Sequence, residues 1–301
     1  MDLRHLRCFL ALAEELHFGR AADRLHMEQS PLSRTIKELE DRLGVRLFNR
    51  DRRGTHLTRA GEVFLQDVRR VFTALEQAKE GARAAAAGHC GLLRVALSDG
   101  ATQPRLAALL ALCREEEPSV EIRLSEVPLI EQLRGLRDGT FDAGFARSDE
   151  VGDGIDAYPL WREPLVVAVP SRHPLLAHRL IPLEELLRYP LVMCHPEVCE
   201  GYCRQVDRVL RAVEVEPNIA ERATSLEMML TLVAAGYGVG FAAAERIAVC
   251  RHPEVVVRPL AHDDAELTTY LLTKTDAEGS ERLDAFVGRA MREAQISNPE
   301  N

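Results

Sequence analysis

Apolar residues recur with helical spacing between positions 29 and 43. Leu32, Ile36, Leu39 and Leu43 stand four, three and four residues apart, which places them on one face of a helix. Gly44 follows, and glycine is common just past the C-terminal end of a helix. The pattern therefore predicts an amphipathic helix that begins at Gln29 or Ser30, ends near Leu43 and is buried along one stripe.

Two further helices are expected before it. Asp2–Glu15 carries apolar residues on one face, and Arg20–Leu25 is a short helix that faces inward with its alanines and Leu25. The polar residues 26–28 separate this short helix from the next one. Two helices joined by a tight turn, backed by a third, form the arrangement that enters the major groove of DNA.

The exposed face of the predicted helix 29–43 combines hydrogen-bonding groups near its start with cations further along. Arginine and glutamine side chains can read base edges, whereas lysine and serine can hold phosphates. An ordinary amphipathic helix with a solvated charged face would show the same pattern. The face alone therefore does not distinguish a DNA-reading helix from an ordinary surface helix. The candidate DNA-binding residues here are Gln29, Ser30, Pro31, Ser33, Arg34 and Lys37.

A β-hairpin is expected next. Val45–Phe48 and His56–Thr58 read as two short strands, and Asn49–Gly54 lies between them. This tip contains three arginines, among them Arg52 and Arg53, so the hairpin could act as a wing that reaches a phosphate backbone or a minor groove.

At these residues the chain resembles a known family. The stretch AADRLHMEQSPLSRTIKELEDRLGVRLFNR, continued by RRGTHLTRAGEVFL, is similar to the N-terminal winged helix-turn-helix of LysR-type transcriptional regulators. Glu28 and Ser30 depart from the residues usual in the family; both lie at the helix entrance, where they concern base preference rather than fold. The resemblance implies that Arg34 contacts a base edge or an adjacent phosphate, while Arg52 and Arg53 hold the DNA backbone.

A long helix is predicted from Arg59 to about Ala87, with Thr58 as its N-cap and Glu62 in its first turn. Its apolar residues alternate between spacings of four and three, the 3.5-residue repeat of a coiled coil. A helix packed on its own domain should instead show a broader stripe at a period of 3.6. The pattern favours a dimerisation seam made by Phe64, Val68, Val71, Leu75, Ala78 and Ala82.

Beyond residue 90 short strands and helices alternate, which predicts α/β units with parallel sheets covered on both faces. By the resemblance this region is a two-lobed, periplasmic-binding-protein-like effector domain. The expected domains are a DNA-binding domain at 1–58, a linker helix at 59–89 and an effector domain at 90–301. In the last of these, lobe I comprises 90–162 and 267–301 and lobe II comprises 163–266.

The resemblance also places the effector between the two lobes. The residues it implies are Ser98, Asp99, Gly100, Ala101, Thr102, Leu129, Arg147, Cys199 and Thr224. Many relatives that bind carboxylates carry Ser or Thr where Asp99 and Leu129 stand here. Asp99 could instead cap the helix that starts near Thr102, or pair with Arg147. If Asp99 faces the cleft, we expect a small polar effector with a donor or cationic group toward it, rather than a plain aromatic acid.

Composition agrees with a DNA-binding head on an acidic body. The chain carries a net charge of −9, but residues 1–58 hold 11 Lys and Arg against 9 Asp and Glu, whereas the remainder holds 27 against 38. No apolar run approaches the roughly 18 residues of a membrane span, and the N-terminus lacks the features of a signal peptide. We therefore expect a cytoplasmic protein.

Other motifs indicate no catalytic or cofactor site. Gly236–Gly240 contains glycines at alternate positions, but it follows a helix and leads into a strand, the reverse of a phosphate-binding loop, so a helix C-cap and turn is favoured. No nucleophile, zinc-protease or nucleotide-binding motif occurs. An enzymatic or small-molecule-binding α/β domain with an incidental basic head stays open as an alternative, although we expect no enzyme and no cofactor.

Cysteine spacing raises a second alternative. The chain has seven cysteines, of which Cys194, Cys199 and Cys203 lie within ten residues together with His195. Cys199 and Cys203 would share one face at a helix start, where thiols are acidified and soft metals could bind. The spacing matches no closed zinc motif, and buried thiols usually act as small apolar groups. A thiol- or metal-sensing regulator is therefore an alternative, with no metal site predicted.

Taken with the resemblance, these patterns predict a sequence-specific transcriptional regulator controlled by a small molecule. Its expected partners are a pseudo-palindromic double-stranded operator, a small-molecule effector and further copies of the chain, as a homodimer or homotetramer, with no membrane contact.

Overall fold

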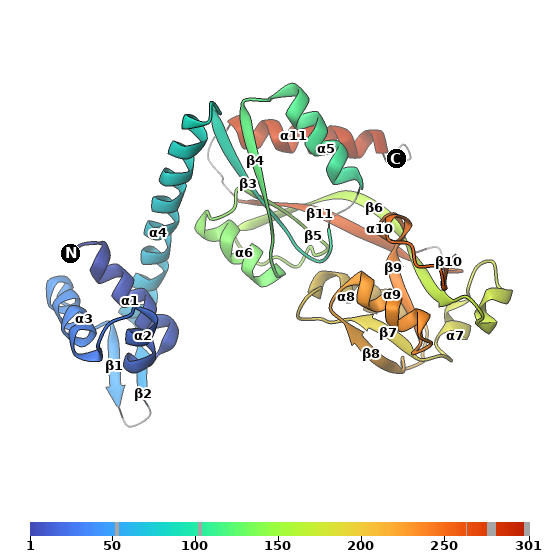
Figure 1. Ribbon diagram of the computed structural model, residues 1–301, viewed down its shortest axis with the longest axis horizontal. Coiled ribbons are helices and arrows are strands. Elements are labelled where there is room, and N and C mark those ends of the chain that lie inside the picture. Colours follow the sequence, from blue (N-terminus) through green and yellow to red (C-terminus); the bar gives the residue numbers. More distant parts are fainter. Residues whose placement is uncertain (52–53, 102–103, 263, 276–280, 298–301) are drawn as a thin grey trace. The chain divides into compact units, whose positions relative to one another are not determined.

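The computed structural model describes residues 1–301 apart from 52–53, 102–103, 263, 276–280 and 298–301, and it leaves the side chains of Arg50, Asp51, Ile296 and Ser297 undescribed. The chain divides into two compact units, Met1–Glu80 and Gly81–Asn301. Figure 1 shows the helices and strands of both units. None of the helices in the described part combines the length and apolar composition that a membrane crossing requires.

The first unit consists of three helices, a hairpin and the start of a long helix. The elements are α1 (Leu3–Glu15), α2 (Phe18–Arg24), α3 (Gln29–Leu43), β1 (Phe48–Asp51), β2 (Gly54–Leu57) and α4 (Arg59–Ala86). Asp2 caps α1 by accepting from the backbone N–H groups of Arg4 and His5. Gly44 ends α3 with a φ of 71°, a left-handed conformation that favours glycine.

Apolar residues from all these helices meet in one core. Phe9, Leu12, Leu32, Ile36 and Leu39 are fully buried in it. The stripe predicted for α3 is therefore confirmed except at Leu43, which is half-buried. The predicted hairpin is present, but its strands are displaced, because β1 begins at Phe48 and Asn49–Asp51 pair with Gly54–His56 instead of forming the tip.

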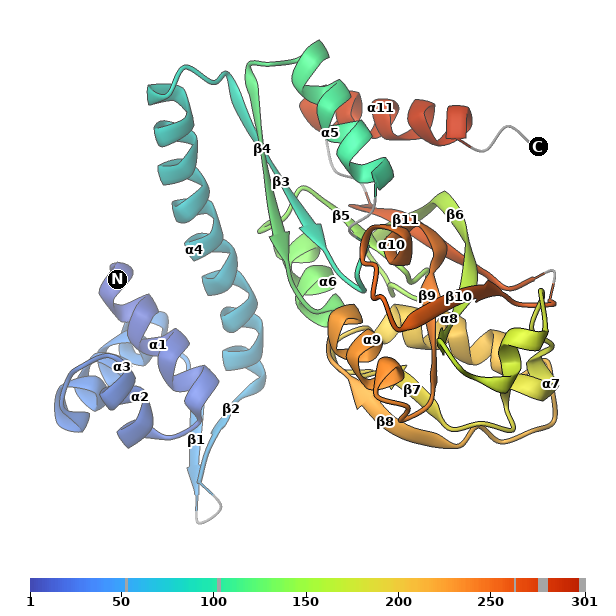
Figure 2. The ribbon, with the colours of Figure 1, turned by 45° about the vertical axis from the view of Figure 1, so that its right-hand side comes forward.

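The second unit contains two lobes that share strands. Lobe I contains β3 (Gly91–Leu97), α5 (Pro104–Glu116), β4 (Val120–Glu126), α6 (Leu129–Asp138), β5 (Ala143–Ala146) and α11 (Glu281–Ser297). Figure 2 shows α5 and α11 side by side. They cover one face of this sheet through an apolar core that includes Leu93, Val95 and Phe145, while α6 packs on the other face.

Lobe II is built in the same way around a second part of the sheet. It contains η1 (Pro174–Ala177), α7 (Leu183–Leu186), β7 (Leu191–Cys194), α8 (Glu200–Leu210), β8 (Ile219–Ala223), α9 (Leu226–Ala234), β9 (Val239–Ala243), α10 (Ala244–Val249) and β10 (Val255–Pro259). Neighbouring residues of the long strand β6 (Ile155–Pro170) face opposite cores. Val167 packs with α7 and α8, whereas Val166 packs with α9 and α10.

Two long strands pass between the lobes. β6 (Ile155–Pro170) and β11 (Glu266–Lys274) pair antiparallel, and the strand order is β4-β3-β5-β11-β6-β9-β7-β8 with β10 beside β6. The two-lobed α/β architecture is thus confirmed, but the expectation of purely parallel sheets is wrong. β6 and β11 run antiparallel to their neighbours because these two long strands join the lobes, and the short strand β10 pairs antiparallel with β6.

Candidate functional site

The exposed face of α3 is the candidate DNA-reading surface. Gln29, Ser30, Arg34 and Lys37 are exposed on it, whereas Pro31 and Ser33 are half-buried. Within the part of the chain that the structure describes, neither Arg34 nor Lys37 has an ion-pair partner. Both cations are therefore available to an external anion.

The hairpin is fixed to α3 by one carboxylate. Glu40 Oε1 accepts hydrogen bonds from the backbone N–H groups of Leu47, at 2.7 Å, and Phe48, at 3.1 Å. Thr58 caps α4 as expected, since its hydroxyl accepts from Gly61 N at 3.0 Å. The other two predicted DNA contacts, Arg52 and Arg53, lie outside the described residues.

The predicted seam residues of α4 fall into two groups. Val68 is fully buried and Phe64 half-buried in the core of the first unit, where Phe64 packs edge-on against Phe9 with 4.9 Å between ring centroids. The core of the first unit therefore covers Val68 fully and Phe64 in part, which leaves the later seam residues as the more accessible group. Val71, Ala78 and Ala82 are exposed and Leu75 is half-buried.

A cavity of about 510 Å³ lies between the two lobes of the second unit. Both lobes contribute walls: Ser98, Asp99 and Arg147 come from the ends of β3 and β5, whereas Cys199 and Thr224 come from the loops around α8 and α9. A volume of this size suits a small organic molecule. The remaining lining residues are Gly100, Glu126, Val127, Pro128, Cys194, Glu197, Val198, Tyr202, Ala223, Ser225, Leu226, Glu227, Met229, Phe241, Ala242, Ala243 and Arg246.

Six of the nine predicted effector residues line this cavity: Ser98, Asp99, Gly100, Arg147, Cys199 and Thr224. Ala101 and Leu129 do not, because each packs into an apolar core of lobe I, and Pro128 lines the wall beside α6 instead. Thr102 lies outside the described residues. Sequence reasoning missed Tyr202, Phe241 and Arg246, which carry no signal of their own and reach the cavity only through the fold.

Asp99 is buried at the lobe I edge of the cavity and bonds to the other lobe. Its Oδ1 accepts from Gly201 N, in the first turn of α8, at 2.9 Å, and its Oδ2 accepts from Arg147 N at 3.3 Å. The described bonds of Asp99 thus go to Gly201, Arg147 and the Ser98 hydroxyl. The alternative that Asp99 caps the helix α5 depends on residues 102–103, which lie outside the described residues. Burial raises the pKa of Asp99, and these donors oppose the rise.

The Arg147 guanidinium pairs with Glu163 and not with Asp99, which was one of the alternatives left open by the sequence. Its Nη2 lies 2.5 Å from Glu163 Oε1, and both side chains are only 1% exposed. Glu163 Oε2 also accepts from Glu245 N at 3.2 Å. Pairing of the Arg147 guanidinium with Asp99 was therefore wrong, because the buried carboxylate of β6 already holds it. Nε and Nη1 of Arg147 are buried and have no hydrogen-bond partner among the described residues.

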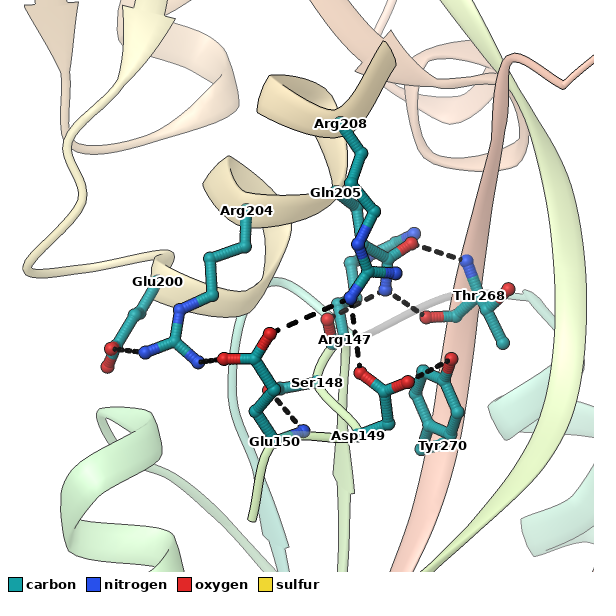
Figure 3. A network of polar contacts seen from close by, with 10 residues as sticks. All are labelled: Arg147, Ser148, Asp149, Glu150, Glu200, Arg204, Gln205, Arg208, Thr268 and Tyr270. Carbon is teal, nitrogen blue, oxygen red and sulfur yellow. Dashed lines mark hydrogen bonds and ion pairs between the residues drawn. The ribbon is translucent and has the colours of Figure 1, made fainter. Parts of the chain in front are cut away.

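A polar network fixes α8 against lobe I (Figure 3). Gln205 Nε2 donates to the backbone oxygens of Arg147, at 2.7 Å, and Thr268, at 2.8 Å, while its Oε1 accepts from Thr268 N at 2.7 Å. Two arginines further out on the same helix pair with acids that follow β5: Arg204 with Glu150 and Arg208 with Asp149. The lobes are therefore held along α8 by directional polar contacts.

The cysteines near the cavity form a local cluster. Cys194 and Cys199 line the cavity, and Cys203 Sγ donates to Cys194 O at 3.4 Å. The interaction between the thiols of Cys194 and Cys199 lowers the pKa of Cys199 and raises the pKa of Cys194. All seven cysteines are free, and among the described residues no group of three or more His, Cys, Asp or Glu side chains is placed to hold a metal ion.

Comparison with known proteins identifies both units. The profile described as "Bacterial regulatory helix-turn-helix protein, lysR family" matches residues 3–62, and that of the "LysR substrate binding domain" matches residues 86–295. The chain belongs to the LysR family of bacterial transcriptional regulators. This LysR regulator is a DNA-binding protein with an effector-binding domain, so the resemblance seen near its N-terminus is confirmed.

Relatives match along most of the chain. The uncharacterized HTH-type transcriptional regulator YnfL of Escherichia coli is 34% identical, over 90% of this chain and 92% of its own length. AlsR of Bacillus subtilis is 36% identical, over 80% of each chain. These relatives are regulators, and nothing in the comparisons favours an enzyme or thiol sensing over an effector-controlled regulator.

Solved structures show the same architecture. Full-length CbnR in complex with its target DNA is 27% identical, with a TM-score of 0.73, and the match covers 98% of this chain and 100% of that one. Full-length BenM is also 27% identical, with a TM-score of 0.60, over 100% and 99% of the two chains.

Proposed function

We propose that this LysR regulator reads its operator with α3 and that a small polar effector in the cavity between the lobes changes how it binds DNA. The observation that carries the proposal is the cavity of about 510 Å³, because residues of both lobes line it. A ligand there contacts both lobes at once, so it favours the arrangement in which its contacts are best made.

For DNA readout the proposal assigns separate roles to α3 and the hairpin. Arg34 and Lys37 are exposed cations without an ion-pair partner in the described part of the chain. The opposite face of their helix packs into the core of the first unit, which supports insertion of the exposed face into a major groove. Arg34 contacts a base edge or neighbouring phosphate, while Gln29, Ser30, Pro31 and Ser33 lie at the same end of the helix. Arg52 and Arg53, which lie outside the described residues, hold the DNA backbone. That CbnR has been solved on its target DNA supports the same mode of binding here.

Titration of labelled DNA fragments, selected by the protein from a random-sequence pool, tests this assignment. Arg34→Ala should weaken binding to the selected site by about 1–3 kcal/mol and reduce its preference over unrelated DNA. The control is Arg7→Ala, which removes an exposed arginine from α1. Affinity of the parent should fall steeply with salt, as phosphate contacts require. Parent-like binding by Arg34→Ala would refute the placement.

Assembly is proposed to use the outer part of α4. Val71 is 44% exposed, although it is a large apolar residue on the 3.5-residue repeat, and the repeat continues through Leu75, Ala78 and Ala82. Two copies of this helix would cover these residues. Leu75→Asp should give monomers in sedimentation, because a carboxylate would be desolvated beside its twin, whereas Gln66→Asp, off the seam, should not. A Leu75→Asp variant that stays oligomeric would exclude this seam.

A further inference from the structure

The Asp99 carboxylate lies in the wall of the cavity between the lobes, at the start of α8. It lies just past β3, where Asp99 adopts a left-handed φ of 54°, and it accepts a hydrogen bond from Gly201 N in the first turn of α8. The start of an 11-residue helix carries a partial positive charge and free N–H groups, and both favour a carboxylate.

Other donors complete this position. Arg147 N and the Ser98 hydroxyl each lie 3.3 Å from Asp99 Oδ2. The Arg147 guanidinium also attracts this carboxylate, and two of its nitrogens are buried without a partner among the described residues. A backbone N–H from each lobe, a hydroxyl and a buried guanidinium are the groups that proteins use to bind carboxylates.

The contact leaves no room for another group. A Cβ added to Gly201 would stand 2.6 Å from Asp99 Oδ2 and 2.7 Å from Arg147 O. The close approach of α8 to lobe I therefore depends on both the glycine and the carboxylate.

We propose that Asp99 is the internal anion of the effector cavity: it fills the carboxylate-binding position at α8, ties the two lobes together there, and makes the cavity selective for neutral or cationic ligands. The rest of the lining supports this ligand class. Glu126, Glu197 and Glu227 also line the cavity, whereas Arg147 is already paired with Glu163. Among the described lining residues Arg246 is the other cation. The ligand class rests on the proposed function, since it assumes that this cavity is the effector site.

Asp99→Gly in the full-length protein tests the proposal. Glycine adopts a φ of 54° without strain, so the substitution removes the carboxylate and leaves space beside its donors. Sodium formate is the probe, with sodium chloride at equal ionic strength as the reference, and the readouts are melting temperature and calorimetric titration. The variant should melt below the parent and bind formate saturably, with a dissociation constant roughly in the millimolar range for so small a ligand. Formate should restore part of the lost melting temperature.

Matched variants separate the possible outcomes. The parent should show no formate effect beyond that of chloride, and neither should Glu126→Ala, which removes an exposed carboxylate from the same cavity. Asp99→Ser opens the same position and is measured in parallel, so the test does not depend on one variant folding. Folded Asp99→Gly and Asp99→Ser proteins without formate binding, or equal binding by the parent, would overturn the proposal. No DNA is involved, so failure of the DNA-binding test leaves this result intact.

Discussion

The core of the first unit and the contact between α8 and lobe I are held by different kinds of interaction. In the first unit Phe9, Leu12, Leu32 and Ile36 are fully buried in a single apolar core, and all lie within a short stretch of chain. At α8 the contacts are hydrogen bonds between distant positions, such as Asp99 with Gly201, which are 102 residues apart. Apolar burial is non-directional and tolerates small shifts, whereas a polar contact is lost when its geometry changes.

This difference suits the two parts to different tasks. The DNA-binding unit must hold α3 in a fixed orientation, and a tightly packed apolar core provides this. A ligand-responsive contact must break and re-form at small cost, and hydrogen bonds achieve this because water can replace each lost partner on opening. We therefore expect the lobe contact along α8 to be the adjustable part of the molecule and the core of the first unit to be the fixed part.

The largest loss of stability is expected when a buried charge in the lobe contact loses its partner. Glu163→Ala leaves the Arg147 guanidinium buried without its carboxylate, and breaking a buried pair in this way costs about 3–5 kcal/mol. Chemical denaturation of the full-length protein should show the loss in the transition of the second unit. Removing the exposed pair partner Glu185, beside Arg188, should change stability by less than about 1 kcal/mol. Equal effects of the two changes would mean that the buried pair is not intact.

A smaller loss is expected from the apolar core. Ile36→Ala deletes a fully buried side chain of α3 and should destabilise the first unit by about 2–5 kcal/mol. Denaturation followed by circular dichroism, together with DNA titration, should show both the lower stability and weaker DNA binding. The control is Val63→Ala on α4, because Val63 is 53% exposed. A second unit destabilised as much as the first would contradict the independence of the two cores.

Replacing Gln205 should lower the stability of the lobe contact, by less than Ile36→Ala lowers that of the first unit. Gln205→Leu keeps the volume but leaves the backbone groups of Thr268 and Arg147 without their partners, at a cost of about 1–3 kcal/mol. Arg208→Ala on the same helix removes only two exposed ion pairs, with Asp149 and Glu150, and should have little effect. If thermal unfolding shows no difference between these two variants, the buried amide does not hold the lobes.

The sequence predicts the fixed part of the molecule better than the adjustable part. Periodicity located α3 with its observed bounds, because one-sided burial leaves a repeat in the sequence. β8 has no recognisable apolar run, because four of its five residues are exposed. β6 is likewise hard to predict over its whole length, because Asp156, Arg162 and Glu163 break up its apolar residues.

The hydrogen-bond and ion-pair partners of the residues that line the cavity were harder still to predict. The family resemblance pointed to Asp99 and Arg147, but no local pattern indicates that Asp99 bonds to Gly201 or that Arg147 pairs with Glu163. Such contacts join residues whose proximity is set by the sheet order, and a polar side chain has the same sequence signature whether it faces water or a buried partner.

The smallest expected effect concerns the N-terminal cap of α1 and depends on pH. Hydrogen bonds from the His5 ring and backbone lower the pKa of Asp2 from 3.8 to about 2. A lowered folded-state pKa means that Asp2 stabilises the first unit above about pH 4 and that this contribution is lost as the pH falls toward 2. The denaturation midpoint of Asp2→Ala should therefore lie below that of the parent at pH 7, and the gap should narrow at pH 3. A gap that is constant with pH would show that the carboxylate charge plays no part.

Amide hydrogen exchange of the full-length protein, measured over a range of low denaturant concentrations, tests the distinction between fixed and adjustable parts most directly. The amides at the start of α8, including Gly201 N–H, should exchange through local openings that expose little surface, so their rates should hardly depend on denaturant. The amides of Leu32 and Ile36 in α3 should exchange only when the first unit unfolds, with a steep dependence. A steep dependence at Gly201, equal to that of α3, would show that the lobe contact does not open on its own and would contradict the account.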